Sequence, residues 1–158
     1  MKRNKKGKKP QIKAIRLWTQ AQAVAVVPYL AAIMRSVREN YLEMQRHQLA
    51  QRRFHAKPGR LDRSGLIAQQ EALTDETQTT DQLQLDLEEL QAIDIYVLDP
   101  VRGEALIPFA NGEGLAWYVF SSFDEQPLSQ WRNHEDPLEM RRPLSELNAA
   151  ATEGTITV

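Results

Sequence analysis

An apolar stripe near the start of the chain gives the first structural signal. Its six residues follow one another at steps of three and four, which places them on one face of a helix. They are Val27, Leu30, Met34, Val37, Tyr41 and Met44. Thr19 and Gln22 have the arrangement of a capping box, so we predict a helix from Thr19 to Phe54. Pro28 lies about two turns into it and is expected to kink the helix or to start a second segment.

A second helix is predicted after Lys57-Pro-Gly59, through which a helix does not readily continue. Ser64 is its candidate N-cap. The apolar stripe of this helix is thinner and consists of Leu66, Leu73, Leu83, Leu87 and Leu90. Polar residues fill its gaps, and Gln48 and Gln51 continue the stripe of the first helix. These polar positions lie opposite each other if the two helices pack antiparallel, so we predict a long, coiled-coil-like helical hairpin.

From Ile93 onward, apolar and polar residues alternate with the period of a strand. Strands are predicted over 93–98, 104–109, 115–123 and 128–132, with turns at 99–103 and 111–114. Connections this short require antiparallel pairing, and Pro108 favours an edge position for its strand. A further short strand is possible over 12–18. The predicted fold class is therefore α+β, a helical hairpin followed by a three- or four-stranded antiparallel sheet that covers its proximal end.

The length of 158 residues suits a single domain. We place that domain at 17–147, between a disordered basic tail at 1–16 and a frayed C-terminal tail at 148–158. The net charge of −1 is the sum of opposed blocks, +8 over 1–16, +5 over 17–63, −7 over 64–92 and −7 over 93–158. The opposite charges of the two predicted helices favour pairing within the hairpin.

The absence of cysteine excludes disulfides and thiolate metal sites. No run of apolar residues is long enough for a membrane span, and no apolar segment follows the basic N-terminus as in a secretory signal. We therefore expect a cytoplasmic protein without membrane contact, and we expect no cofactor.

The N-terminal segment is a candidate contact for nucleic acid or another polyanion. Its cations are Lys2, Arg3, Lys5, Lys6, Lys8 and Lys9. The alternative is a solubilising tail without a specific partner, since no aromatic residue is interleaved to stack on bases.

Aromatic and arginine residues in the C-terminal half suggest a ligand site between sheet and helices. Trp117 and Trp131 would line a pocket, with Arg132, Arg141 and Arg142 as an anion clamp. In the alternative interpretation the tryptophans belong to the core and the arginines form internal ion pairs.

The sequence His134-Glu135-Asp136 is the densest group of potential metal ligands. Consecutive residues of a turn point in different directions, whereas a metal site needs converging ligands. A solvated acidic turn is the simpler interpretation.

Several short motifs resemble an uncharacterised bacterial family, the domain of unknown function 2203. Segment 17–30 opens with Leu-Trp-Thr-Gln-Ala-Gln-Ala and closes with Val-Pro-Tyr-Leu, and further similarities lie at 115–117, 124–125, 131–132 and 141–143. Three positions depart from the family pattern, because Ala116 replaces a Cys, Asp124 a Gly and Arg132 a His. The resemblance spans about 17–144 and implies a fold and a family label, but no activity.

These patterns favour a non-catalytic interaction or scaffold protein that acts through the hairpin, binding a protein partner or a second copy. The expected self-association residues are Leu30, Met34, Val37, Tyr41 and Met44. One alternative is a small-molecule or anion-binding module with its site around Trp117, Trp131, Arg132 and Arg142. Another is nucleic-acid binding through 1–16. No catalytic residue is proposed, and the question of an enzyme activity stays open.

Overall fold

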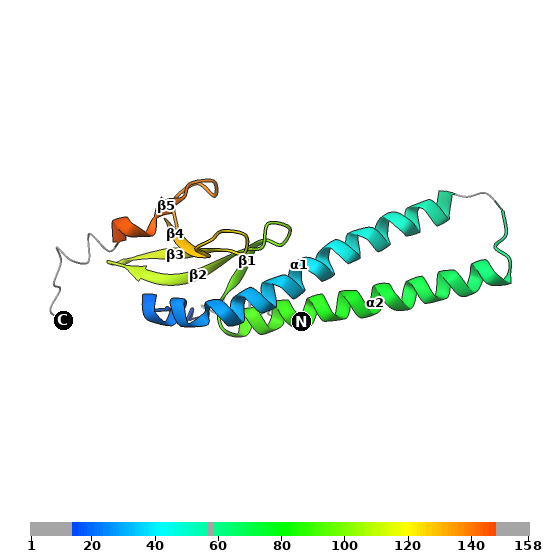
Figure 1. The fold of residues 1–158 in the computed structure, drawn as a ribbon, viewed down its shortest axis with the longest axis horizontal. Helices are drawn as coiled ribbons and strands as arrows, with labels where there is room; N and C mark the ends of the chain where they lie inside the picture. The colour runs from blue at the N-terminus through cyan, green and yellow to red at the C-terminus, as the bar shows by residue number, and fades with distance from the viewer. Residues whose placement is uncertain (1–13, 57–58, 148–158) are drawn as a thin grey trace, which may run out of the picture.

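The computed structural model describes residues 14–56 and 59–147, which form two long helices and an antiparallel sheet (Figure 1). The elements in chain order are α1 (Gln20–Ala56), α2 (Arg63–Ala92), β1 (Tyr96–Asp99), β2 (Glu104–Asn111), β3 (Gly114–Ser121), β4 (Leu128–Asn133) and β5 (Arg142–Pro143). The predicted α+β fold is confirmed. The sheet has five strands in the order β1-β2-β3-β4-β5, one more than the upper expectation. The predicted tail at 148–158 lies outside the described residues, as does most of the tail at 1–16.

Helix α1 begins with the predicted capping box. The Gln22 amide donates to Thr19 Oγ1 at 3.2 Å, and the Thr19 amide donates to Gln22 Oε1 at 3.1 Å. The helix then continues through Pro28 as one element, so the expected second segment does not form. An interior proline costs about 3 kcal/mol, whereas burial of each large apolar side chain contributes about 1.5–3 kcal/mol. Several such side chains follow Pro28, and their burial outweighs its cost.

Both ends of α2 differ from the sequence prediction. Its N-cap is Asp62 rather than Ser64, because the Asp62 carboxylate accepts the Gly65 amide at 2.8 Å. At the other end the helix runs to Ala92 and is terminated by Asp94, whose φ of 58° lies in the left-handed region. The strand predicted from Ile93 therefore begins only at Tyr96.

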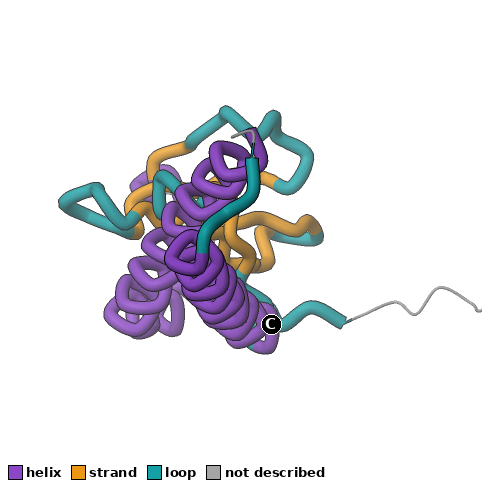
Figure 2. Tube along the Cα trace, turned by 90° about the vertical axis from the view of Figure 1, so that its right-hand side faces the viewer, coloured by secondary structure: helices purple, strands orange, loops and turns teal. Residues whose placement is uncertain are grey.

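The core lies where both helices meet one face of the sheet, which we call the inner face. Leu30, Met34 and Val37 of α1 are completely buried there together with Phe120 of β3. The helices and the sheet form two layers, seen from the end of the helices in Figure 2. Both helices extend well beyond the sheet (Figure 1). The expected core is thus confirmed, and it is confined to the proximal half of the hairpin.

Trp18 attaches the segment before α1 to this core. Its amide donates to the Pro108 carbonyl at 2.8 Å, and its indole Nε1 donates to the Ile93 carbonyl at 3.1 Å. Residues 14–18 nevertheless form no strand, contrary to the prediction over 12–18, of which the first two residues are not described.

Pro108 lies in a central strand, so the edge-strand prediction is wrong for β2 as a whole. β2 pairs with β3 along its length, but β1 pairs with it only from Glu104 to Leu106. The Pro108 carbonyl binds Trp18, so it faces away from β3. The N–H that proline lacks would face the same uncovered side, because both backbone groups of a strand residue point to one side. Locally, Pro108 has the environment of an edge.

Hydrogen bonds, rather than the expected ion pairs, join the two helices. Tyr29 donates to Glu89, Ser36 Oγ donates to Asp86 Oδ2 at 2.5 Å, and Gln51 donates to Glu76. Within the described parts of α1 and α2, no arginine of one helix forms an ion pair with an acid of the other. None of the described helices is long and apolar enough to cross a membrane.

The buried Asp86 carboxylate yields a stability prediction. It accepts hydrogen bonds from Ser36 and from Gln82 Nε2, the latter at 2.9 Å. Ser36→Ala removes one donor from a buried acceptor, so we expect a loss of about 1–3 kcal/mol in the free energy of unfolding, measured by chemical denaturation. Thr77→Ala is the control, since its exposed hydroxyl only bonds the Leu73 carbonyl in its own helix. Equal effects of the two substitutions would contradict the prediction.

Candidate functional site

The strand alternation separates the two tryptophans of the predicted pocket. Trp131 faces the helices, where its ring centroid lies 6.1 Å from that of Phe109. Trp117 belongs to a second, smaller cluster on the opposite, outer face of the sheet. Its ring contacts Tyr96 edge to face at 5.7 Å. The two tryptophans therefore do not line a common pocket, and that part of the ligand-site prediction is corrected.

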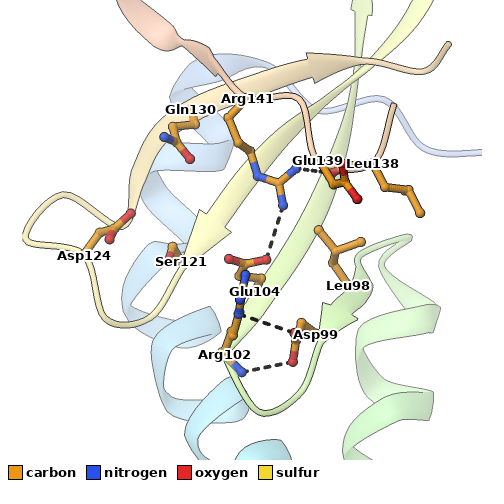
Figure 3. A pocket seen from close by; sticks show the side chains of 10 residues that line it. All are labelled: Leu98, Asp99, Arg102, Glu104, Ser121, Asp124, Gln130, Leu138, Glu139 and Arg141. Atoms are coloured by element: carbon orange, nitrogen blue, oxygen red, sulfur yellow. Dashed lines mark hydrogen bonds and ion pairs between the residues drawn. The ribbon is translucent and has the colours of Figure 1, made fainter. Parts of the chain in front are cut away.

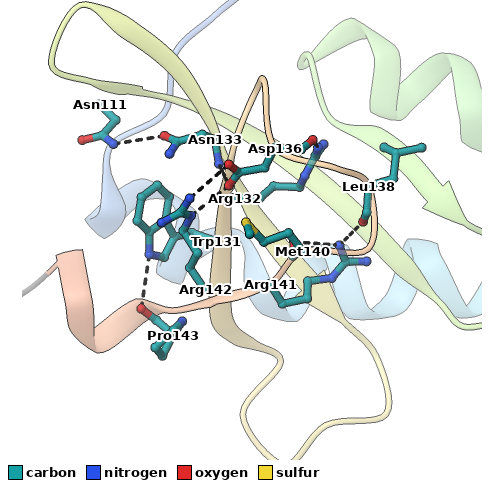
Figure 4. Close-up of polar contacts among 10 residues, drawn as sticks. All are labelled: Asn111, Trp131, Arg132, Asn133, Asp136, Leu138, Met140, Arg141, Arg142 and Pro143. Carbon is teal, nitrogen blue, oxygen red and sulfur yellow. Dashed lines mark hydrogen bonds and ion pairs between the residues drawn. The ribbon is translucent and has the colours of Figure 1, made fainter.

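Each arginine of the predicted anion clamp has a partner within the chain (Figure 4). Arg142 binds Asp136 with two hydrogen bonds of 2.9 and 3.0 Å. Arg141 binds Glu104 at 3.3 Å and also donates to the carbonyls of Leu138 and Met140. These two guanidinium groups are thus engaged and do not converge as an anion clamp.

Arg132 is the most deeply buried member of the group. Only 4% of it is exposed, and it pairs in register with Trp117 on the outer face. Its Nη2 donates to the backbone carbonyl of Asp136, while its buried Nε has no partner among the described residues. Arg132 and Arg142 together hold the connection between β4 and β5 against the sheet through Asp136.

This arrangement lowers the pKa of the Asp136 carboxyl group. The hydrogen bonds from Arg142, followed by that from the Asn133 amide at 2.9 Å, lower the pKa of Asp136 to about 2. Asp136 in turn raises the pKa of Arg142. Both groups are held charged over the whole neutral range, which suits an attachment point and not a proton-transfer group.

An open cavity of about 540 Å³ lies on the outer face, between the β1–β2 turn and the β4–β5 connection (Figure 3). The Glu104–Arg141 ion pair lies within it, and Asp99 and Arg102 form a longer pair of 3.9 Å at its rim. Leu98 and Leu138 provide apolar lining. The cavity is a polar hollow whose arginines are already paired.

The side chains predicted as possible metal ligands form hydrogen bonds with different residues of the chain. His134 Nδ1 accepts the Trp117 indole N–H at 3.1 Å, whereas Asp136 binds Arg142. Across the two described ranges, no three or more His, Asp or Glu side chains are grouped so that they could hold a metal ion. His134, Glu135 and Asp136 line a second open hollow of about 500 Å³ without converging on one point.

The predicted self-association stripe is covered by the chain itself. Leu30, Met34 and Val37 are completely buried, and Tyr41 and Met44 are partly buried against the same core. The reason is that the sheet and α2 together enclose this side of α1. Leu30, Met34 and Val37 therefore offer no surface to a second copy, and the self-association prediction is corrected for these three residues. Tyr41 and Met44 keep part of their surface exposed.

Apolar residues are exposed instead where the hairpin extends beyond the sheet. We call this part the distal arm, residues 45–56 of α1 and 63–81 of α2. Leu49 and Leu66 are each 56% exposed, Ile67 is 50% exposed and Leu73 is 43% exposed. A cleft of about 210 Å³ lies between the helices here, lined by Phe54, Ala72 and Leu73 among others. The two helices diverge toward their connection in Figure 1, in agreement with this cleft.

Sequence reasoning missed the partners of the arginines and the exposure of the distal leucines. Asp136 is only six residues from Arg142, so their spacing carried a usable signal. Glu104 is 37 residues from Arg141, and only the sheet brings the two together. The predicted polyanion contacts at residues 2–9 lie outside the described part of the chain.

The Asp136–Arg142 pair yields a pH prediction. Because folding lowers the pKa of Asp136 from 3.8 to about 2, the pair stabilises the fold at pH values above 4, and this contribution is lost as the pH falls from 4 to 2. Asp136→Asn should therefore destabilise the protein at neutral pH, and the difference from the unsubstituted chain should shrink across that range. Unfolding measured as a function of pH tests this, with the exposed Asp124→Asn as control. A constant difference down to pH 2 would contradict it.

Comparisons with known proteins give no match to a family model, to a curated protein or to a solved structure. The resemblance to the domain of unknown function 2203 stays a prediction from the motifs over 17–144. The two candidate surfaces of the molecule are therefore those described above, the outer face of the sheet and the distal arm.

Proposed function

We propose that this chain is a non-catalytic interaction protein whose contact surface is the distal arm. The observation that carries the proposal is that both helices pack into the core at one end but expose apolar side chains at the other. The exposed residues are Leu49, Leu66, Ile67 and Leu73. Several large apolar side chains that stay exposed on one part of a folded protein are typical of a surface that binds a partner.

Leu49, the exposed leucine of α1, lies on the side of this helix that faces the sheet. Closer to the start of the helix, the sheet covers that side. Arg38 marks that side, because its Nε donates to the Val101 carbonyl at 2.9 Å and its guanidinium lies 5.0 Å from the centre of the Phe123 ring. Leu49 follows Arg38 by eleven residues, which is about three helical turns, so it faces the same way. Beyond the end of the sheet this side of α1 has no cover.

The leucines of α2 show the same arrangement, in which a distal exposed leucine lies on the side of the helix that packs against the core nearer the sheet. Leu66 and Leu73 precede Leu87 by three and two heptads, which places them within about 60° and about 40° of its side of the helix. Leu87 packs against the core, whereas the two distal leucines are exposed. One apolar side thus runs along the whole hairpin, and its distal half is uncovered.

The partner that best fits this surface is a second copy of the chain. A pair of helices without a third layer buries little apolar surface, and two such pairs form a four-helix bundle with a common core. The cleft lined by Phe54, Ala72 and Leu73 would receive side chains of the other arm. The sheet stops short of this region, so it leaves room for a second pair of helices (Figure 1).

The alternative of a ligand-binding module has less support. Arg141 and Arg142, which were expected to receive an anion, form ion pairs with Glu104 and Asp136. The outer-face cavity remains as a hollow, but nothing in its lining favours one ligand.

Self-association through the distal arm is tested by paired substitutions in the full chain. Leu49→Gln with Leu73→Gln should lower the mass measured by light scattering to that of the monomer, with an effect of about tenfold or more on the dimer dissociation constant. The helical circular dichroism and thermal unfolding of the monomer should be retained, because both leucines are exposed in it.

Val24→Gln with Leu85→Gln is the matched control. These residues lie on the same two helices and are at least as exposed as Leu49 and Leu73, but they are outside the distal arm. The control variant should associate like the unsubstituted chain. The proposal is refuted if the unsubstituted chain is monomeric at all concentrations, or if the two variants behave alike.

A further inference from the structure

A cluster of arginines lies at the end of the distal arm that is farthest from the sheet. Arg52 and Arg53 belong to the last turns of α1, Arg60 lies in the connection and Arg63 begins α2. We call these four residues the arm tip. All four are exposed, as is the neighbouring His55.

Among residues 14–56 and 59–147, no acid neutralises the arm tip. The only acid from residue 52 to residue 63 is Asp62, and its carboxylate already accepts hydrogen bonds from the Gly65 amide and from Ser64 Oγ as the N-cap of α2. Among the described residues, Arg46 pairs with Glu43, but none of the tip arginines forms an ion pair. Their charge is therefore available to a partner.

The helix dipoles account for the basic residues at the end of α1 but not for the arginine at the start of α2. A cation in the last turn of α1, such as Arg53, interacts favourably with the negative end of the helix dipole. Arg63 lies at the opposite, positive end of α2, whose first turn contains no acid. A cation there opposes the dipole, typically by about 0.3–1 kcal/mol. Arg63 thus adds positive charge at a helix end where the dipole favours negative charge.

We infer that the arm tip binds the phosphate backbone of single-stranded nucleic acid. The guanidinium group presents a planar fork of donors that matches phosphate, and its plane also stacks on bases, as does an imidazole such as that of His55. The tip therefore combines phosphate contacts with several planar groups, whereas the lysine-rich segment at 2–9 has only that of Arg3.

The charge of the neighbouring surface confines this site to the end of the arm. The next charged residues along α2 are Glu71, Asp75, Glu76 and Asp81, and no base lies among them. These acids repel a polyanion from the side of α2. Helix α1 has 37 residues, so its end at the tip lies about 55 Å from its start at 1.5 Å per residue. A nucleic acid bound there is kept away from the acidic body.

This inference does not rest on self-association, because the arginines and the exposed leucines are different residues. A monomeric chain that binds nucleic acid through its tip would refute the proposed function and support this inference. A dimer that binds no nucleic acid would do the reverse.

The test is fluorescence anisotropy of the full chain with a labelled single-stranded RNA of about 20 nucleotides. With three phosphate contacts at the tip, affinity should fall at least about 20-fold between about 50 and about 200 mM salt. Arg52→Gln, Arg60→Gln and Arg63→Gln combined should weaken binding at the lower salt by about tenfold or more and should reduce the salt slope by about 2. Loss of fold is not expected, since Arg63→Gln removes an unfavourable charge from the start of α2.

The charge-matched control combines Arg16→Gln, Arg35→Gln and Arg102→Gln, which lie on exposed surface away from the tip. It should change the affinity by less than about threefold, because only its long-range charge is lost. The experiment is repeated in a second background, in which the six cations at residues 2–9 are replaced by Gln. The tip substitutions should still weaken binding in that background.

Three outcomes would overturn the inference. The first is that the unsubstituted chain binds no RNA at the lower salt. The second is that the tip variant and the charge-matched control bind equally well, which would assign binding to total charge or to the N-terminal segment. The third is that the tip substitutions abolish sedimentation with phosphatidylserine vesicles but leave RNA binding unchanged, which would assign the tip to a membrane surface.

Discussion

The packing of α1 between α2 and the inner face of the sheet is the interaction on which the rest of the structure depends. Leu30, Met34 and Val37 are completely buried by it, and Phe120 meets them from the sheet. A five-stranded sheet with an apolar face and a hairpin with a single apolar side are each incomplete alone. Their contact gives the chain one core and fixes where that core ends. The distal arm is the part of the hairpin that this core does not reach.

Much of the fold could be predicted because the spacing of apolar residues along the chain indicates helices and strands directly. Apolar steps of three and four identified both helices, and alternation identified the strands. What failed depended on tertiary context. Burial carried α1 through Pro28, the left-handed Asp94 delayed the first strand, and the two-residue strand β5 is too short to leave a periodic signal.

The candidate sites were less predictable because they depend on which face a side chain occupies. The alternation of β3 and β4 alone could not place Trp117 and Trp131 on opposite faces, since the register between the strands was unknown. The self-association stripe was correctly identified as apolar, but its cover could not be deduced without the sheet. The charge of residues 17–63 was counted correctly and assigned to pairing with α2. That assignment failed because four of its arginines gather at the arm tip, beyond the acids of α2.

Pro108 has a consequence for how this protein behaves among its own copies. The uncovered edges of sheets are templates on which strands of other chains can add, and proteins block them to avoid aggregation. Where β1 stops pairing with β2, such an edge would open at residue 108. Proline has no N–H to offer an incoming strand, and its carbonyl is already bound by the Trp18 amide. The same residue that interrupts an otherwise regular strand pattern therefore blocks edge-to-edge growth of the sheet at this point.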